Sequence, residues 1–522
     1  MSELVHDFIF HAARLTPAAE ALVHGARRLD YAALAGAVTA AAQVLLGCRI
    51  ARGERVAVYM EKRVEHVTAC YGAALAGAVF VPVNPLLKPG QVAHILGDCE
   101  VRILVTTPER LRLLEPVLAN LPALRTVLVA GAAELPRLAG LSVEPWEQPP
   151  GELAPHRVID TDMAAILYTS GSTGKPKGVV LSHRNLVAGA VSVASYLALD
   201  SADRVLAALP LSFDYGLNQL TSAFHAGACV VLINHLFARD IARAVAEESI
   251  TGLAAVPPLW MQLAQLDWPA DCSLRYLTNS GGAMPRPTVQ ALRAALPQAE
   301  LFLMYGLTEA FRSTYLAPAE LARRPDSMGR AIPNAEVLVV RPDGSLCDPD
   351  EPGELVHRGA LVAMGYWNDP LKTAERFRPA PGQDPALPLP EMAVWSGDTV
   401  RRDPEGFLYF VGRADDMIKV SGYRVSPTEI EEAAYASGLA TEVAAFGVAH
   451  PALGQAVVLV ALAPPGSEGA LLKHCQQHLP TYMAPAHIAL RTDALPRNPN
   501  GKIDRKLLQQ SFSTLFESVS PP

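Results

Sequence analysis

The chain has little of what marks several large classes of protein. Charged residues make up 18% of its 522 residues, and acidic residues outnumber basic ones by 52 to 44, which gives a net charge of −8. We therefore expect no basic face for nucleic acid. No run of about 18 uncharged apolar residues occurs, so we expect no membrane span. The start, MSELVHDFIFHAARL, lacks a basic cluster and a long apolar core, so we do not expect a signal peptide.

Cysteine is scarce and scattered. The seven cysteines are odd in number and form no CxxC pair. This pattern predicts buried, reduced thiols in a cytoplasmic protein, with neither a zinc site nor a disulfide framework. Half of the residues are apolar, which allows a large core and more than one domain. The cysteines are Cys48, Cys70, Cys99, Cys229, Cys272, Cys347 and Cys475.

Apolar runs of strand length alternate with helical patterns over most of the chain. The stretch 66–85 joins a helix of small residues to an apolar strand, and buried strands are expected on either side of it. This alternation predicts an α/β architecture with parallel sheets. The strand-like runs lie at 54–60, 101–106, 126–131, 205–211, 225–233, 252–258, 274–282 and 300–306.

The pattern changes at about residue 335. Short alternating strands with glycine-containing turns predict a small β-barrel-like subdomain, and the proline-rich stretch 378–390 predicts an irregular surface loop. Helix and strand patterns then resume. We expect a large N-terminal domain over 1–412 and a small α+β domain over 413–522. The later helix patterns lie at 426–437 and 470–479, and the later strand patterns at 442–449 and 456–464.

The segment LYTSGSTGKPKGVVLSHRNL, residues 167–186, is rich in glycine and hydroxyl side chains. Gly171 and Gly174 let backbone N–H groups converge on an anion, and Lys175 and Lys177 add positive charge. Such a loop suits a polyphosphate, although a loop of this composition is also common as a linker. It is not a Walker P-loop, because Pro176 breaks the GxxxxGK[ST] spacing. The hydroxyls come from Thr169, Ser170, Ser172 and Thr173.

This loop resembles the phosphate loop of the AMP-forming adenylating superfamily, which includes acyl-CoA synthetases, nonribosomal-peptide adenylation domains and firefly luciferase. The resemblance covers nearly the whole chain, because further motifs follow in the family's order. In detail, SFDYGLNQ and YGLTEAFRSTYL most resemble the acyl-CoA ligases found with exosortase systems. The motifs are RRLDYAALA at 27, AGAVFVPVNP at 76, LPLSFDYGLNQ at 209, NSGGAMP at 279, YGLTEA at 305, WSGD at 395, GRADDMIKVSGYRVSPTEIE at 412 and NPNGKIDR at 498.

The resemblance implies a two-step reaction that uses ATP and Mg²⁺. A carboxylate attacks the α-phosphate of ATP and gives an acyl-adenylate and pyrophosphate. The pantetheine thiol of CoA, or of a carrier protein, then displaces AMP. The implied substrate is a small carboxylic or amino acid, and the implied protein is a cytoplasmic monomer or homodimer.

The same resemblance assigns roles to individual residues. Glu309 would hold Mg²⁺, because a hard cation prefers a carboxylate oxygen. Thr308 would contact the α-phosphate, and Lys502 would bridge that phosphate and the attacking carboxylate. Asp415 would be the hinge between the domains, and Gly422 would lie beside the pantetheine arm after rotation.

The remaining implied residues bind the nucleotide. Tyr305 would stack on adenine, and Asp398 and Arg413 would accept and donate hydrogen bonds at the ribose. Arg413 is also suited to a surface ion pair. The full nucleotide set is Thr169, Ser170, Gly171, Ser172, Thr173, Gly174, Lys175, Lys177, Gly281, Gly282, Ala283, Tyr305, Gly306, Asp398 and Arg413.

The acyl pocket is expected around Asp214, Tyr215, Asn218 and Arg312. An aspartate in the FD context pairs with the substrate ammonium in amino-acid-activating relatives. Asp214 is equally suited to pair with Arg312, and Arg312 in turn is suited to a second carboxylate of the substrate. Together with Gln219, these residues favour a short, polar or amino-bearing acid over a fatty acid.

Three functions therefore stay open at this point. The first is an acyl-CoA or aminoacyl-CoA ligase. The second is a stand-alone adenylation enzyme that loads a carrier protein in trans. The third is a non-catalytic or an oxidative relative; the presence of Glu309, Asp398 and Lys502 argues against a loss of activity, whereas a luciferase-like oxygenation stays open.

Overall fold

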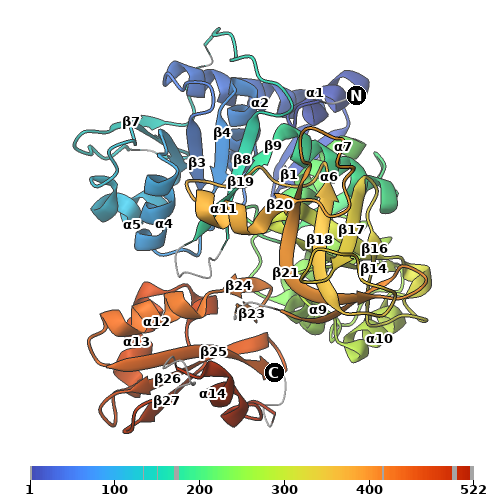
Figure 1. The fold of residues 1–522 in the computed structure, drawn as a ribbon. Coiled ribbons are helices and arrows are strands. Elements are labelled where there is room, and N and C mark those ends of the chain that lie inside the picture. The colour runs from blue at the N-terminus through green and yellow to red at the C-terminus, as the bar shows by residue number, and fades with distance from the viewer. Residues whose placement is uncertain are drawn as a thin grey trace.

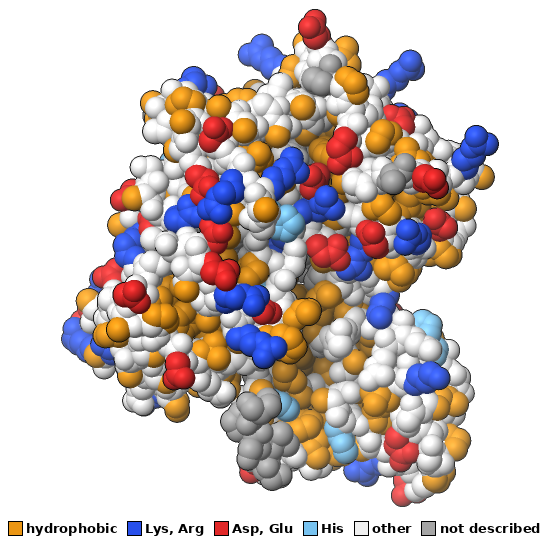
Figure 2. Space-filling model, turned by 180° about the vertical axis from the view of Figure 1, so that it is seen from behind, with side chains coloured by type: hydrophobic (Ala, Val, Ile, Leu, Met, Phe, Trp, Pro, Cys, Tyr) orange, Lys and Arg blue, Asp and Glu red, His pale blue; other side chains and the backbone are white. Residues whose placement is uncertain are grey.

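The structure is a computed structural model that describes residues 3–132, 134–149, 151–169, 176–413, 417–496 and 503–517. Within these ranges the strands form three sheets, two in a large N-terminal part and one in a small C-terminal part (Figure 1). No helix in the described ranges is both long and apolar enough to cross a membrane. Seen from behind, acidic and basic side chains are interspersed over the surface (Figure 2).

The first sheet has the order β19-β9-β8-β4-β3-β5-β6-β7. In this order, each strand from β8 to β7 pairs parallel with the next one. Its central strands are buried along their whole length, as is typical of parallel strands covered by helices on both faces. Helices α3 (Val64–Ala76), α4 (Pro89–Asp98) and α5 (Pro108–Leu118) connect the strands β3 to β6 in chain order. The strands are β3 Arg55–Tyr59, β4 Val79–Pro82, β5 Ile103–Thr106, β6 Thr126–Val129, β7 Ser142–Pro145, β8 Met163–Thr169, β9 Lys177–Ser182 and β19 Gly365–Tyr366.

The second sheet has the order β17-β18-β21-β22-β16-β15-β14-β13-β12-β10-β11-β1-β2, with β20 on β21. Strands β10 to β14 are parallel, and the expected α/β architecture is confirmed. The strands are β1 Glu20–His24, β2 Arg27–Asp30, β10 Arg204–Ala207, β11 Cys229–Leu232, β12 Gly252–Ala255, β13 Tyr276–Asn279, β14 Glu300–Leu307, β15 Phe311–Leu316, β16 Ser327–Ala331, β17 Ala335–Val340, β18 Gly353–Gly359, β20 Phe377–Pro379, β21 Met392–Arg402 and β22 Leu408–Arg413.

The strands after residue 335 pair antiparallel, as their alternating pattern predicts. They are joined to the second sheet, because β22 pairs with β16, which pairs with β15. This subdomain is therefore hydrogen-bonded to the sheet that carries the YGLTE segment, which the sequence pattern alone did not indicate. The segment between β20 and β21 has no helix or strand, in agreement with the proline-rich pattern.

The helices of the N-terminal part pack on both sheets (Figure 1). Helix α6 contacts α7, and both lie beside the hairpin of β14 and β15. The helices are α1 Asp7–Leu15, α2 Tyr31–Gly47, α3 Val64–Ala76, α4 Pro89–Asp98, α5 Pro108–Leu118, α6 His183–Tyr196, α7 Asp214–Ala226, α8 Ala238–Glu247, α9 Pro257–Leu263, α10 Arg286–Ala295 and α11 Pro370–Arg376, with 3₁₀ turns η1 Thr308–Ala310 and η2 Pro318–Glu320.

The C-terminal part is a small α+β domain with its own apolar core (Figure 1). The third sheet has the order β24-β23-β26-β25, with β27 parallel to β26. Its helices and strands match the expected pattern, whereas the boundary at residue 412 stays a prediction. The elements are β23 Ile418–Val420, β24 Tyr423–Val425, α12 Pro427–Ala436, β25 Glu442–His450, β26 Gly454–Leu462, α13 Glu468–His478, η3 Thr481–Met483, β27 His487–Arg491 and α14 Arg505–Ser511.

Candidate active site

The hairpin of β8 and β9 carries the glycine- and hydroxyl-rich loop. Thr169 and Lys177, which flank the loop, pair across the two strands. Lys177 is half-buried and its ammonium lies 5.3 Å from the centre of the Tyr366 ring. Burial lowers the pKa of Lys177. The residues between them that the sequence singles out, Ser170, Gly171, Ser172, Thr173, Gly174 and Lys175, lie outside the described residues.

Glu309 lies in the short turn η1 that joins β14 to β15, and its side chain is buried. The hydroxyl of Tyr366 donates a 2.6 Å hydrogen bond to its Oε1 atom. No group of three or more Asp, Glu, His or Cys side chains among the described residues has the arrangement of a metal cage. A single buried carboxylate fits Mg²⁺, which proteins bind through one or two carboxylates together with phosphates and water.

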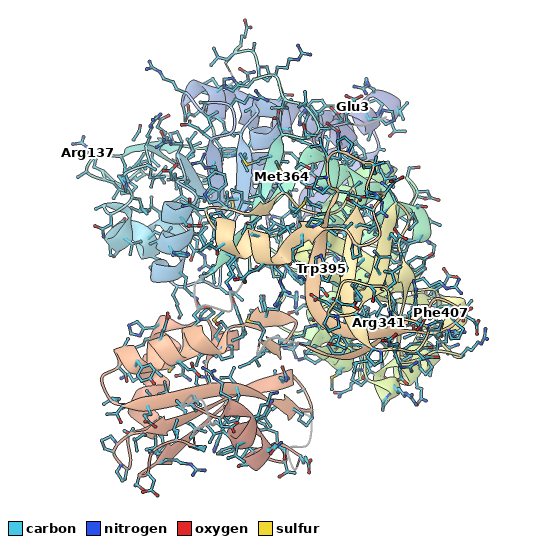
Figure 3. All side chains as sticks on the ribbon, in the orientation of Figure 1. Glu3, Arg137, Arg341, Met364, Trp395 and Phe407 are labelled. Carbon is cyan, nitrogen blue, oxygen red and sulfur yellow. The ribbon has the colours of Figure 1, made fainter. Side chains whose placement is uncertain are left out.

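Tyr305 and Asp398, which lie 93 residues apart, meet at the end of β14. The Tyr305 hydroxyl donates a hydrogen bond to Asp398 Oδ2. Asp398 lies on β21 directly opposite Arg413 of β22, so the two residues expected at the ribose are neighbours in the backbone. The Arg413 side chain is not among the described atoms. Trp395, labelled in Figure 3, precedes this site on β21 and is covered by the guanidinium of Arg378 at 3.7 Å.

A cleft of about 740 Å³ lies between the N-terminal and C-terminal parts. One wall is formed by the glycine-rich turn after β13 and by the end of β14, and the other by the third sheet and α14. The cleft therefore joins the predicted nucleotide residues to the C-terminal domain. Among its lining residues are Gly281, Gly282, Ala283, Tyr305, Gly306, Lys419, Gly422, Arg505 and Lys506.

Gly281 and Gly422 approach each other across this cleft. Both have positive φ angles, +84° and +85°. A Cβ atom on Gly281 would lie 3.7 Å from the Cα atom of Gly422, and one on Gly422 would lie 2.6 Å from Val256 Cγ1. Only glycine fits both the backbone angle and the space at Gly422. The β23–β24 hairpin can therefore lie against the nucleotide wall of the cleft.

A second contact between the two parts joins α4 to α12. The Gln91 side-chain amide donates a 2.7 Å hydrogen bond to Glu429 Oε1. Glu429 is buried, and burial raises the pKa of its carboxyl group from the usual 4.5 to about 7. Sequence analysis missed this pair, because nothing in either local pattern relates residues 338 positions apart.

Replacing Glu429 with glutamine tests the effect of this buried carboxyl group on stability. Because its pKa is raised, the Glu429 carboxyl group contributes fully to the free energy of unfolding below about pH 4.5. This contribution is lost as the pH rises through about 7. We expect the variant to lack this loss, which amounts to up to about 3 kcal/mol between pH 5 and 8. Urea unfolding at several pH values measures it. Equal pH dependence in Glu429→Gln and wild type would contradict the assignment, and Glu468→Gln, at the exposed start of α13, serves as the control.

The residues expected at the acyl pocket also lie together. Asp214, Tyr215 and Asn218 form the first turn of α7, and Arg312 lies on β15 beside it; all four are buried. The Arg312 guanidinium lies 4.1 Å from the centre of the Tyr215 ring, and the Tyr215 hydroxyl is hydrogen-bonded to Thr278 at 2.7 Å. Asn218 turns its amide to Thr221 on its own helix.

Asp214 and Arg312 are close enough to interact electrostatically but form no ion pair within 4.0 Å. Burial raises the pKa of Asp214 to about 6, and the positive charge of Arg312 only partly opposes this shift. Of the two partners that the sequence left open for Asp214, Arg312 is therefore not engaged as a direct partner in this structure.

Two comparisons with protein families decide the identity. The AMP-binding enzyme family matches residues 9–367, and the AMP-binding enzyme C-terminal domain matches residues 429–502. The chain belongs to the AMP-binding enzymes. It is an AMP-forming ligase with the α/β fold that the motifs predict.

Two curated relatives match along almost their whole length. An L-proline–[L-prolyl-carrier protein] ligase of Streptomyces coelicolor is 34% identical, with 93% of this chain and 92% of that protein covered. An indoleacetate–CoA ligase of Aromatoleum aromaticum is 32% identical, with 97% of each chain covered. The amide bond synthetase McbA of Marinactinospora thermotolerans has the same fold, with a TM-score of 0.86, 23% identity and coverage of 98% and 99%.

The structure thus brings Thr308, Glu309, Tyr305 and Asp398 to one site, and places Gly281 and Gly422 on facing walls of the cleft. Lys502 and Asp415 lie outside the described residues, so their roles stay predictions. Sequence analysis missed Tyr366, the hydrogen-bond donor to Glu309. Its only signal was an aromatic residue in the GYW segment, which lies far from the YGLTE motif in the chain.

Proposed function

We propose that this AMP-binding enzyme is an ATP-dependent acid–thiol ligase that adenylates a small amino acid and transfers it to a pantetheine thiol. The buried carboxylate of Asp214, which forms no ion pair with a described residue, carries the proposal. Burial without a direct cationic partner is costly for a carboxylate, and the ammonium group of a substrate would supply that partner. The L-prolyl-carrier protein ligase among the relatives supports an amino acid as the substrate.

The first half-reaction would use the residues around Glu309. A substrate carboxylate oxygen forms a bond to the α-phosphorus of ATP while the bond to the bridging oxygen breaks, and pyrophosphate leaves. Glu309 would hold Mg²⁺, which would neutralise charge on the phosphates. Thr308 and Lys177 would bind phosphate oxygens, Tyr305 would stack on adenine, and Asp398 would accept hydrogen bonds from the ribose.

The second half-reaction would take place in the arrangement that the structure has. The thiol sulfur forms a bond to the acyl carbon, the bond to AMP breaks, and the thiol proton passes to solvent. Gly422, which has no side chain, leaves room for a narrow arm beside Gly281. Lys502 would occupy the site during adenylation and leave it before the thiol enters, through rotation about Asp415.

The hinge proposal predicts an unequal effect of Asp415→Pro. Proline fixes φ near −65° and would restrict rotation. We expect the rate of thioester formation to fall about tenfold or more, with a smaller effect on acid-dependent pyrophosphate exchange. Separate assays of acid-dependent pyrophosphate exchange and of thioester formation measure the two effects. An equal loss in both half-reactions would contradict a hinge at Asp415. Asp416→Pro, one residue further, distinguishes a hinge at Asp415 from a turn cap, a role to which Asp416 is also suited.

CoA is the first candidate for the thiol. Lys419 and Lys506 line the cleft from the C-terminal domain and would favour an acceptor with phosphate groups, whereas Arg505 beside them is paired with Glu431. A carrier protein is the second candidate, because the 34% identical relative is a ligase of a carrier protein. AMP release with an amino acid and either CoA or a phosphopantetheinylated carrier decides between them. If neither CoA nor the carrier stimulates AMP release, the proposal of a thiol ligase is contradicted.

A further inference from the structure

Arg312 is a buried cation that forms no ion pair with a described residue, although the Asp214 carboxylate lies close enough to interact with it electrostatically. Its side chain is 2% exposed, and neither Nη1 nor Nη2 has a hydrogen-bond partner among the described residues. A guanidinium group remains charged at any physiological pH and carries five N–H donors. Leaving such a group buried and unpaired is costly, so its position in the acyl region needs an explanation.

The aromatic neighbours of Arg312 cover its face but do not pair with its Nη1 and Nη2 donors. The guanidinium carbon lies 4.1 Å from the centre of the Tyr215 ring and 5.5 Å from that of Phe311. A cation–π contact stabilises the positive charge through the face of the aromatic ring. The N–H groups of the guanidinium instead point outward in its own plane. Hydrogen-bond acceptors are therefore still required at the edge.

Arg324 provides a comparison within the same chain. It is also buried and lies over an aromatic ring, 4.0 Å from the centre of Phe407, which is labelled in Figure 3. Three carboxylates, those of Glu320, Asp403 and Glu405, pair with it. Stacking on a ring thus does not replace ion pairs at Arg324, whereas Arg312 forms no ion pair with a described residue.

Helix α7 and strand β13, which carry Tyr215 and its partner Thr278, have other unsatisfied polar groups. Both polar atoms of the Gln219 side chain, one turn along α7 from Tyr215, are buried and unpaired among the described residues. The Oδ1 atom of Asn279 is in the same state, next to Thr278, which binds the Tyr215 hydroxyl. Polar groups that the protein leaves unpaired are suited to a polar ligand.

We propose that Arg312 binds a second anionic group of the acid substrate. This inference rests on the proposed function and deepens it: the substrate class would be an amino acid with two carboxylates. One carboxylate reacts with ATP, the ammonium lies at Asp214, and the second carboxylate pairs with the edge of the Arg312 guanidinium. The pair would be bidentate, which is the geometry that guanidinium and carboxylate groups favour.

Acid and amide pairs test this assignment without knowledge of the exact substrate. We would measure acid-dependent pyrophosphate exchange with L-aspartate against L-asparagine and L-glutamate against L-glutamine. In the wild-type protein we expect kcat/KM for at least one acid to exceed that of its amide by about 30-fold or more, because a buried charge pair is truncated in the amide. In Arg312→Met that ratio should fall to near one.

The matched control is Arg401→Met, which removes a guanidinium that lies 4.4 Å from the ring centre of Tyr409, away from the cleft. It should keep the wild-type ratio. Arg312→Lys should keep part of the preference, because the positive charge remains without the bidentate edge.

Two outcomes would overturn the inference alone. One is exchange with L-proline or another monocarboxylic amino acid that exceeds exchange with every dicarboxylic acid tested. The other is an acid-to-amide ratio near one in the wild-type protein, which decides the matter even when Arg312→Met fails to fold. Absence of exchange with every acid would instead refute the proposed function itself.

Discussion

Replacing Lys502 with alanine is expected to slow adenylation by about 100- to 1,000-fold, which is the usual cost of removing one group that stabilises developing charge. Thioester formation from a supplied acyl-adenylate should change little, because in the proposed mechanism Lys502 would leave the site before this step. The prediction rests on the resemblance of NPNGKIDR to the family's motif and on the arrangement of the β23–β24 hairpin, which here lines the cleft.

Two assays separate the half-reactions. Acid-dependent pyrophosphate exchange reports adenylation, and a synthetic acyl-adenylate with CoA or a carrier reports thioester formation. Lys473→Ala, on the surface of α13, is the control and should match the wild type in both. An equal loss in both half-reactions of Lys502→Ala would contradict its assignment to the first step.

Replacing Asp214 with asparagine is expected to lower kcat/KM for amino acids by about 100-fold, because the ammonium loses a buried anionic partner. The pH dependence should change as well. Since the pKa of Asp214 is raised to about 6, wild-type kcat/KM for an amino acid should fall about tenfold for each pH unit below 6. The variant should lack this fall. Pyrophosphate exchange between pH 5 and 8 measures both effects.

Stability separates this role from a structural one. With a raised pKa, Asp214 stabilises the fold most below about pH 3.8 and costs stability as the pH rises to about 6. At pH 7 the asparagine variant should thus be at least as stable as the wild type. The exposed Asp267→Asn is the control. A less stable variant that is equally impaired with amino acids and with acids lacking an amine would contradict amine binding.

Much of the fold follows from local patterns in the sequence. The apolar runs at 252–258, 274–282 and 300–306 became the neighbouring parallel strands β12, β13 and β14, because continuous apolar runs of this length suit strands that are buried on both faces. The junction of the later antiparallel strands with the same sheet depends on pairing between distant segments, which local patterns do not encode.

In the candidate site too, motifs locate single residues, whereas the contacts between them depend on the fold. Motif order located Glu309, Tyr305 and Asp398, whereas the hydrogen bonds from Tyr366 to Glu309 and from Tyr305 to Asp398 required the fold. Sequence analysis placed Asp214 and Arg312 in one pocket but left open whether they pair. The answer depends on the orientation of the guanidinium over Tyr215, which is set by packing among α7, β13 and β15.

The central claim is that the chain activates an amino acid by forming an acyl-adenylate. Exchange of labelled pyrophosphate into ATP, with Mg²⁺ and a panel of amino acids, dicarboxylic acids and fatty acids side by side, tests it most directly. The account predicts exchange that depends on the added acid and is fastest with an amino acid. Exchange with none of the acids, or with fatty acids alone, would contradict it.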